Sequence, residues 1–177
     1  MTKNTVLSIF KIEDILELPS AISMLLEEDF DQRNDIYKQL LDANNNDLSY
    51  DWFQELYEDD FAQRKQDKQD FTPNSVGVLL SQITGCEPGR IYEPTAGNGS
   101  LLIANWWYRK NNSVNFNTSD YPIECWDLSN RSLPILLLNL SIRNIQGNVF
   151  HGNVLSKEIR ATYLLTSDIK FSKINKL

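Results

Sequence analysis

The stretch EPTAGNG, residues 93–99, constrains the fold of this chain more than any other part of the sequence. The short run Arg90–Tyr92 leads into it, and the amphipathic run Ser100–Lys110 follows it. Glycine adopts backbone angles that other residues avoid, and it lets a ligand lie against the main chain. Gly97 and Gly99 between these two runs therefore predict a strand, a ligand-binding loop and a helix in succession.

Strands and helices are expected to alternate after this loop. Apolar runs predict strands at 123–128, 148–152 and 162–165, with a helix over 129–144 between the first two. Such alternation favours an α/β fold with a parallel sheet and right-handed crossovers. In sheets of this kind ligands bind at the carboxyl ends of the strands.

The part of the chain before the loop has helical periodicity. Apolar residues recur with a spacing near 3.6, which predicts helices over 12–30, 31–43 and 49–65, the first of them broken at Pro19. A further helix should begin at Thr72-Pro73, with the Thr72 hydroxyl as cap and Pro73 at the first helical position. The fold class is thus α/β with an N-terminal helical segment.

Charge is unevenly distributed along the chain, whose net charge is −7. Residues 1–60 contain 15 acidic and 4 basic side chains, whereas residues 61–177 contain 9 acidic and 13 basic ones. This asymmetry indicates two units, an acidic helical segment at 1–60 and a sheet domain at 61–177. Because the first unit should repel nucleic acid and the second is only weakly basic, we expect DNA binding to be weak or to depend on a partner.

Several classes of protein are disfavoured by the sequence. The longest apolar runs, such as Ile135–Leu138, are too short to span a membrane, and the N-terminus becomes acidic too early for a signal peptide. Cys86 and Cys125 match no metal or redox spacing, which indicates reduced thiols in a cytoplasmic protein. His151 is the only histidine, so a His-rich metal site or a Ser-His-Asp triad is poorly supported.

The glycine loop does not match the common phosphate-binding motifs. A Walker loop would have Lys-Ser or Lys-Thr after its last glycine, whereas Ser100-Leu101 follows here. The third glycine of a dinucleotide fingerprint would fall at Leu102. Glu93, just before the loop, instead suits a ligand with a cationic or hydrogen-donating group, and S-adenosylmethionine has both an ammonium and a sulfonium.

Two further polar residues follow expected strands. Asp127 ends the second strand, where a carboxylate can accept hydrogen bonds from both ribose hydroxyls, although an acid that stabilises the next helix is an alternative. Asn153 follows the third strand. Its amide could pair with an adenine edge, or it could be a turn residue, and the sequence favours neither.

Four stretches in order resemble the N6-adenine DNA methyltransferases, and most of all the modification subunit of type I restriction systems. They are LYEDDFAQRKQDKQDFTPNSVGVLLSQI from residue 56, RIYEPTAGNGSLLIA from 90, CWDLSNRSLPILLLNLSIRNI from 125 and HGNVL from 151. The resemblance implies a truncated Rossmann-like core that binds S-adenosylmethionine, unless that capacity has been lost.

The resemblance also implies roles for particular residues. Phe71, Thr72 and Pro73 would close over the methionine end of the cofactor, and Asp127 would hold the ribose. The loop beneath the cofactor would consist of Glu93, Thr95, Ala96, Gly97 and Gly99. Asn153 stands where the family usually has an aspartate facing the adenine, and Glu93 stands where the family usually has Asp.

The catalytic motif of the family is missing. In these enzymes a fourth strand ends in Asn-Pro-Pro followed by Phe or Tyr, which binds and stacks the target adenine. The corresponding run here, Tyr163–Ile169, has no Asn, no Pro and no aromatic residue at the needed position, and no Asn-Pro pair occurs anywhere in the chain. No catalytic residue is therefore assigned.

Three functions remain open. The first, which we favour, is a binding domain that lacks catalysis by itself and acts with a protein partner, such as a restriction-modification or related nucleic-acid enzyme. The second is an active adenine methyltransferase that a partner completes. The third is an inhibitor whose acidic helices imitate the charge of DNA.

Overall fold

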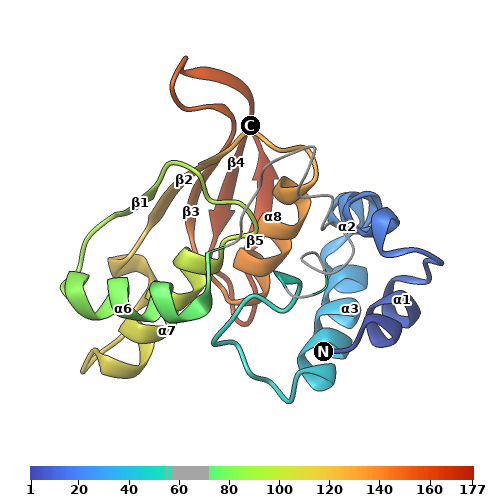
Figure 1. Cartoon of the computed structure of the whole chain (residues 1–177), viewed down its shortest axis with the longest axis horizontal. Helices are drawn as coiled ribbons and strands as arrows, with labels where there is room; N and C mark the ends of the chain where they lie inside the picture. Colours follow the sequence, from blue (N-terminus) through green and yellow to red (C-terminus); the bar gives the residue numbers. More distant parts are fainter. Residues whose placement is uncertain (55, 57–71) are drawn as a thin grey trace.

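The computed structural model describes residues 1–54, 56 and 72–177. Within them five strands form one sheet in the order β1-β2-β3-β4-β5, and the helices lie on one side of it (Figure 1). The strands are β1 Ile91–Glu93, β2 Ile123–Asp127, β3 Gly147–Asn153, β4 Glu158–Thr166 and β5 Lys173–Lys176. The helices are α1 Lys3–Phe10, α2 Leu18–Glu27, α3 Phe30–Ala43, α6 Asn74–Thr84, α7 Ser100–Asn112 and α8 Ser132–Ile142, and short 3₁₀ turns cover Ile15–Glu17 and Thr118–Asp120.

The sheet is mixed rather than wholly parallel. β1, β2 and β3 run parallel, as expected, but β4 is antiparallel to β3 and β5 is antiparallel to β4. Only Val154–Lys157 connect β3 to β4, whereas a parallel neighbour needs a crossover of about a dozen residues. The expectation of a parallel sheet is therefore confirmed for the first three strands and wrong for the last two.

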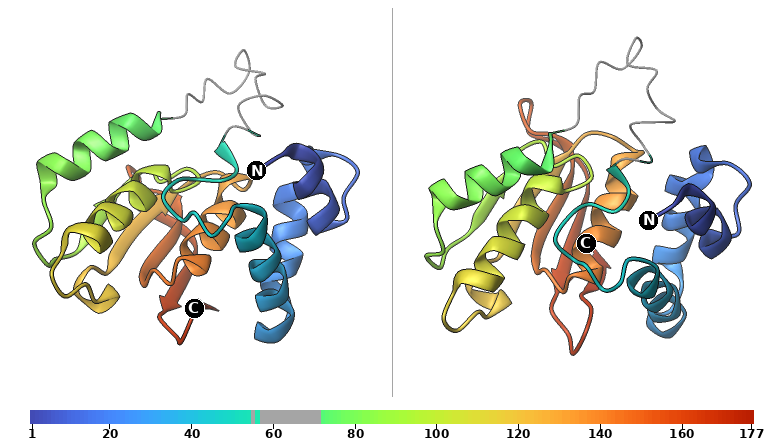
Figure 2. Two further views of the ribbon diagram at one scale, coloured as in Figure 1. Left: turned by 90° about the horizontal axis from the view of Figure 1, so that it is seen from below. Right: turned by 60° about the horizontal axis from the view of Figure 1, so that its bottom comes forward.

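Helix α8 is buried on all sides. Every residue from Leu133 to Ile142 is buried. Leu136 and Leu140 pack with the sheet, while Ile135, Leu138 and Ile142 belong to a core shared with α1–α3. A helix that is apolar all round must be covered all round, and Figure 2 shows α8, in orange, between the strands and the N-terminal helices.

The acidic N-terminal segment folds onto this helix. α1 begins at a Thr2 cap, the first 3₁₀ turn at an Asp14 cap and α3 at an Asp29 cap. The division of the chain at residue 60 stays a prediction. The core shared with α8 includes residues from both parts. None of the helices in the described ranges has the length and apolar content to cross a membrane.

The helix predictions for this segment are partly confirmed. The predicted break at Leu18-Pro19 is present, because the 3₁₀ turn ends at Glu17 and α2 begins at Leu18. Pro19 lies in the first turn of α2, where an N–H has no partner within the helix. The predicted helix over 49–65 is not present at its start, where Trp52 and Phe53 are buried in a turn, and most of it lies outside the described residues. The helix over 31–43 is confirmed as α3, with Tyr37 and Leu40 buried.

α8 packs against the sheet on one side and against the N-terminal helices on the other. Shortening an apolar side chain on the side that faces the N-terminal helices should therefore destabilise the protein. Leu138 is 0% exposed, so Leu138→Ala should lower the free energy of unfolding by about 2–5 kcal/mol, because it leaves a cavity between α8 and the N-terminal helices. Urea denaturation measures this change. Val114 is 97% exposed, and Val114→Ala should stay within about 0.5 kcal/mol of the wild type. Equal effects of the two substitutions would contradict the central position of α8.

Candidate cofactor-binding site

Three of the predicted site residues end neighbouring parallel strands. Glu93 ends β1, Asp127 ends β2 and Asn153 ends β3. Because these strands are parallel, their carboxyl ends meet at one edge of the sheet. The structure therefore brings the three side chains to the edge at which ligands bind in such folds.

The glycine loop is hydrogen-bonded to the end of β2. The Ala96 N–H donates to the Trp126 carbonyl at 2.8 Å, and the Gly97 N–H donates to Asp127 Oδ2 at 2.7 Å. Gly97 and Gly99 have φ of +54° and +94°, the left-handed region that favours glycine. The predicted turn from strand to helix is thus confirmed.

The two glycines serve different purposes. A Cβ on Gly99 would come within 2.9 Å of Leu136 Cδ1, so this position packs the start of α7 against α8. A Cβ on Gly97 would meet no atom within 4 Å. Gly97 therefore leaves its main chain open to a ligand, while Gly99 is required by the protein's own packing.

Asp127 holds the loop and keeps some acceptor capacity. Its Oδ1 accepts from the Ser129 N–H at 2.8 Å, and its Oδ2 accepts from Gly97. A carboxylate oxygen has two lone pairs, so each oxygen retains one. Burial raises the pKa of Asp127, and the two backbone hydrogen bonds oppose that rise. The hydrogen bond to Ser129 fits the alternative of an acid before a helix, and the remaining lone pairs are acceptors of the kind that ribose hydroxyls require.

Glu93 and Asn153 are each partly used by a local turn. Glu93 Oε1 accepts from the Thr95 N–H at 3.1 Å, and Oε2 has no hydrogen bond within the described residues. Asn153 Oδ1 accepts from the N–H groups of Leu155 at 3.0 Å and Ser156 at 3.3 Å. The structure thus gives Asn153 a turn role, and contact with adenine would fall to its Nδ2.

The Phe-Thr-Pro element is only partly described. Phe71 lies outside the described residues. Pro73 is the N-cap of α6 and no side chain caps the helix, so the prediction that Thr72 is the cap is wrong by one position. The extended backbone of Pro73 (ψ 143°) explains why the helix begins at Asn74. The Thr72 carbonyl accepts from Gln54 Nε2 at 3.2 Å, which connects this element to the N-terminal segment.

A buried polar network connects the loop to α8 and to the N-terminal segment. Asn139 Nδ2, on α8, donates to Asp51 Oδ1 at 2.9 Å and to the Asn98 carbonyl in the loop at 3.0 Å. The Ser100 hydroxyl donates to Asp51 Oδ2 at 3.4 Å. This network was not predicted from the sequence. Its one sequence signal is Asn139 within the apolar run LPILLLNL, because a buried amide needs partners.

Arg143 extends the network to the N-terminal segment. Its guanidinium donates to the carbonyls of Leu48, Tyr50 and Asn139. Burial lowers the pKa of Arg143 to about 10, and nearby Asp51 opposes that effect. Residues 48–54 are therefore hydrogen-bonded to α8 and to Ser100 at the start of α7. Asn139 joins Asp51 to the Asn98 carbonyl, so the loop is connected to the acidic segment through α8.

The run that stands at the position of the missing catalytic motif lies elsewhere. Because β4 is antiparallel to β3, Leu165 pairs with Gly147 at the start of β3, at the opposite edge from Asp127. Beyond it Asp168 forms an ion pair with Lys173 at 2.8 Å, and Phe171 packs edge-on against Tyr37 in the N-terminal core. Neither side chain reaches the edge of the glycine loop.

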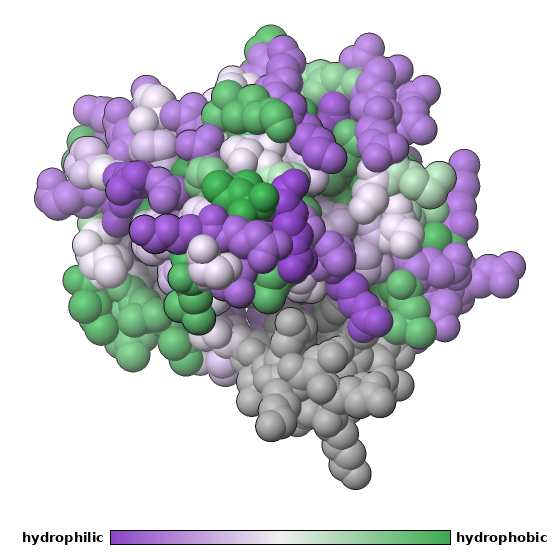
Figure 3. Space-filling view, turned by 90° about the horizontal axis from the view of Figure 1, so that it is seen from above, coloured by the Kyte–Doolittle hydropathy of each residue, from purple (hydrophilic) through white to green (hydrophobic). Residues whose placement is uncertain are grey.

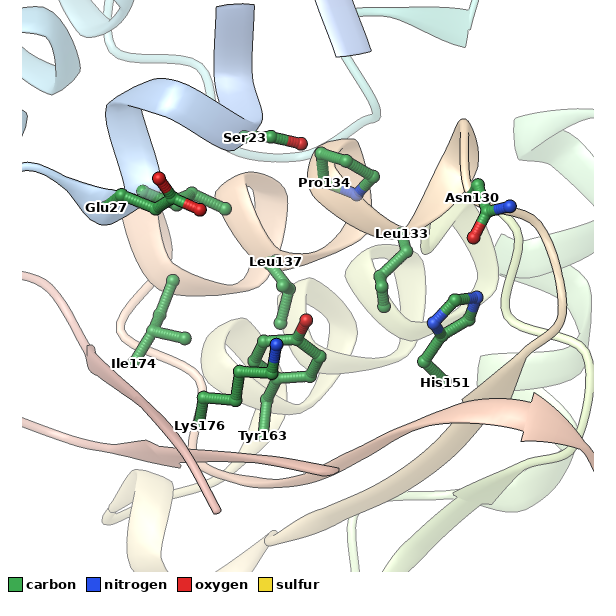
Figure 4. A pocket seen from close by; sticks show the side chains of 11 residues that line it. Ser23, Glu27, Asn130, Leu133, Pro134, Leu137, His151, Tyr163, Ile174 and Lys176 are labelled. Carbon is green, nitrogen blue, oxygen red and sulfur yellow. The ribbon is translucent and has the colours of Figure 1, made fainter. Parts of the chain in front are cut away.

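A cavity of about 330 Å³ lies between α2, α8 and strands β3–β5 (Figure 4). Its walls combine apolar groups such as Leu137 and Ile174 with His151, whose Nε2 is buried without a partner among the described residues. None of the predicted site residues lines this cavity. One of its lining residues, His151, nevertheless pairs with Asp127 across β2 and β3, so the cavity lies beside the end of β2.

These features define an α/β protein in which a glycine loop follows the first parallel strand and an acid ends the second. A sequence model of the N-6 DNA methylase family matches residues 48–173, and the chain belongs to this family. The matched range includes the loop, Asp51 and Asp127, and the family generally uses S-adenosylmethionine. A search of curated proteins finds no match.

The buried acid gives the stability of the protein a distinct pH dependence. Burial raises the pKa of Asp51 above its ordinary value of 3.8. Between the unfolded and folded pKa values the native state binds more protons, so this group lowers stability as the pH rises. Asp51→Asn cannot titrate, and the unfolding free energy of wild type relative to this variant should therefore decrease as the pH rises above about 4.

Thermal and urea denaturation across this pH range measure the difference. Val114 does not titrate and is 97% exposed, so Val114→Ala should give a curve parallel to that of the wild type. Parallel curves for wild type and Asp51→Asn would show that Asp51 does not titrate in the way its burial requires.

Proposed function

We propose that the chain binds S-adenosylmethionine at the glycine loop and by itself does not transfer the methyl group. The observation that carries the first part is the arrangement of Asp127 and Gly97. One carboxylate ties the loop to β2 and retains a lone pair on each oxygen, beside a glycine whose main chain is open. Membership of a family that generally uses this cofactor supports the same conclusion.

Each residue at the edge has a role in this proposal. Asp127 accepts hydrogen bonds from the two ribose hydroxyls. Glu93 Oε2 accepts from the amino group of the methionine part, Asn153 Nδ2 donates to the adenine edge, and the Thr72-Pro73 element covers the methionine end. When bound, the cofactor would supply an electrophilic methyl group on its sulfonium.

Two observations support the absence of transfer by the chain alone. A target adenine taken out of the duplex needs acceptors for its amino group and a ring on which to stack. The run Tyr163–Ile169 has no Asn-Pro-Pro sequence, and the strand before it lies on the far side of β3 from β1. Among the described residues, this run therefore supplies no side chains beside Asp127 and the loop that could bind and stack a target adenine.

The proposed biological role is binding within a modification system in the cytoplasm, nearest to the modification subunit of type I restriction systems. The net charge of −7 disfavours direct binding to DNA by this chain. A protein partner, itself a restriction-modification or related nucleic-acid enzyme, would bring the chain to DNA.

Calorimetric titration with S-adenosylmethionine tests the binding. Wild type should show a saturable isotherm, and Asp127→Ala should weaken it by about ten- to a hundredfold, because two hydrogen bonds to a charged group are lost. Asp127→Asn keeps one acceptor oxygen and should fall between them. Leu155→Ala, in the β3–β4 connection, is the matched control and should bind like the wild type. An unchanged affinity of Asp127→Ala would exclude the proposed site.

Methyl transfer is tested with cofactor labelled in its methyl group and duplex DNA. The purified chain should leave the adenines of the DNA unlabelled, while an active adenine methyltransferase in parallel labels them. Label transferred by the chain alone would contradict the proposal. Label that appears only after a cell extract is added would favour an enzyme that a partner completes.

A further inference from the structure

Helix α6 presents its large apolar side chains to solvent. Val76, Val78, Leu79, Leu80 and Ile83 are between 40% and 73% exposed. The residues of α6 that are buried are Gly77 and Ser81. This distribution is the reverse of an ordinary surface helix, which turns its apolar face to the core.

The orientation of α6 is fixed by close contact with α7. A Cβ on Gly77 would come within 2.8 Å of Ala104 Cβ, so no larger residue fits at this crossing. The buried Ser81 hydroxyl donates to the Gly77 carbonyl at 2.7 Å, which keeps it within the helix. Rotation of α6 that buried its leucines would separate these small residues from α7, so the apolar face stays outward.

The exposed side chains form a continuous stripe, which we call the α6 stripe. It consists of Val76, Leu79, Leu80 and Ile83, which recur at spacings of three and four residues and so share one face of the helix. Figure 3 shows a hydrophobic cluster over α6 at the lower left of the molecule. Clustered apolar groups of this kind mark interaction surfaces, whereas scattered ones do not.

Charge decides what covers the stripe. Residues 72–86 contain no charged side chain, although the chain carries a net charge of −7. DNA-binding surfaces and membrane-binding helices both depend on Lys and Arg, which this region lacks. The acidic helices α1–α3 lie at the other end of the molecule (Figure 1). Two copies of the chain can therefore meet at α6 without bringing their acidic segments together.

We propose that a second copy of this chain covers the α6 stripe, with two α6 helices packed antiparallel about a two-fold axis. In such a contact the same patch lies on both subunits, and apolar rows spaced three and four residues apart can interdigitate. Leu79 and Leu80, in the middle of the helix, lie nearest the axis, and Val76 of one copy lies near Ile83 of the other. This proposal does not depend on cofactor binding.

Sedimentation equilibrium of the purified chain tests the dimer. Wild type should show a reversible monomer–dimer equilibrium in the micromolar range, because a contact built on one short helix is at the small end of stable interfaces. Leu79→Glu should raise the dissociation constant on the order of a hundredfold, since the dimer would bury an unpaired carboxylate. Leu155 is 92% exposed, and Leu155→Glu should leave the equilibrium unchanged. Circular dichroism confirms that both variants are folded.

Disulfide trapping tests the geometry. In a Cys86→Ser background, Leu79→Cys should form a covalent dimer on mild oxidation, because the middle of the helix meets itself across the axis. Leu155→Cys in the same background should form no covalent dimer. The proposal is overturned if the wild type is a monomer at every concentration, if the dimer survives Leu79→Glu, or if a different protein occupies the stripe while the chain alone remains monomeric.

Discussion

The burial of α8 on every side is the constraint on which the rest of the structure depends. An apolar helix between a sheet and a helical layer can include a polar residue only if that residue finds partners. Asn139 finds them in Asp51 and in the Asn98 carbonyl, and Arg143 finds them in the backbone of Leu48 and Tyr50. The hydrogen bonds that satisfy the polar side chains of Asn139 and Arg143 thus also connect the N-terminal segment to α8 and, through Asn139, to the glycine loop.

The two glycines of the loop meet different requirements, although they stand in one sequence motif. Gly99 is needed because α7 starts against Leu136, a requirement of packing, whereas Gly97 leaves the main chain accessible, a requirement of binding. Asp127 meets both demands, because each oxygen accepts one backbone N–H and still has a lone pair. A site of this kind can therefore be preserved by folding alone, since loss of Asp127 would loosen the loop whether or not a ligand is bound.

Local patterns in the sequence predicted the strand, loop and helix around Gly97, the helices α3 and α8, and the acid at the end of β2. These features depend on neighbours along the chain. The direction of β4 depends on the short length of the connection Val154–Lys157, which hydrophobic periodicity does not reveal. The Asp51–Asn139 contact joins residues far apart in the sequence, and a single sequence contains no signal of that pairing beyond an isolated Asn in an apolar run.

The shared core of α1–α3 and α8 has a consequence for the order of events during synthesis. The N-terminal helices emerge first from the ribosome, but Ile135, Leu138 and Ile142, which complete their core, are made much later. Until then Tyr37, Leu40 and Phe53 lack the surface that buries them. The N-terminal helices therefore cannot complete their core until residues 135–142 have been made, and the nascent chain exposes apolar surface until then.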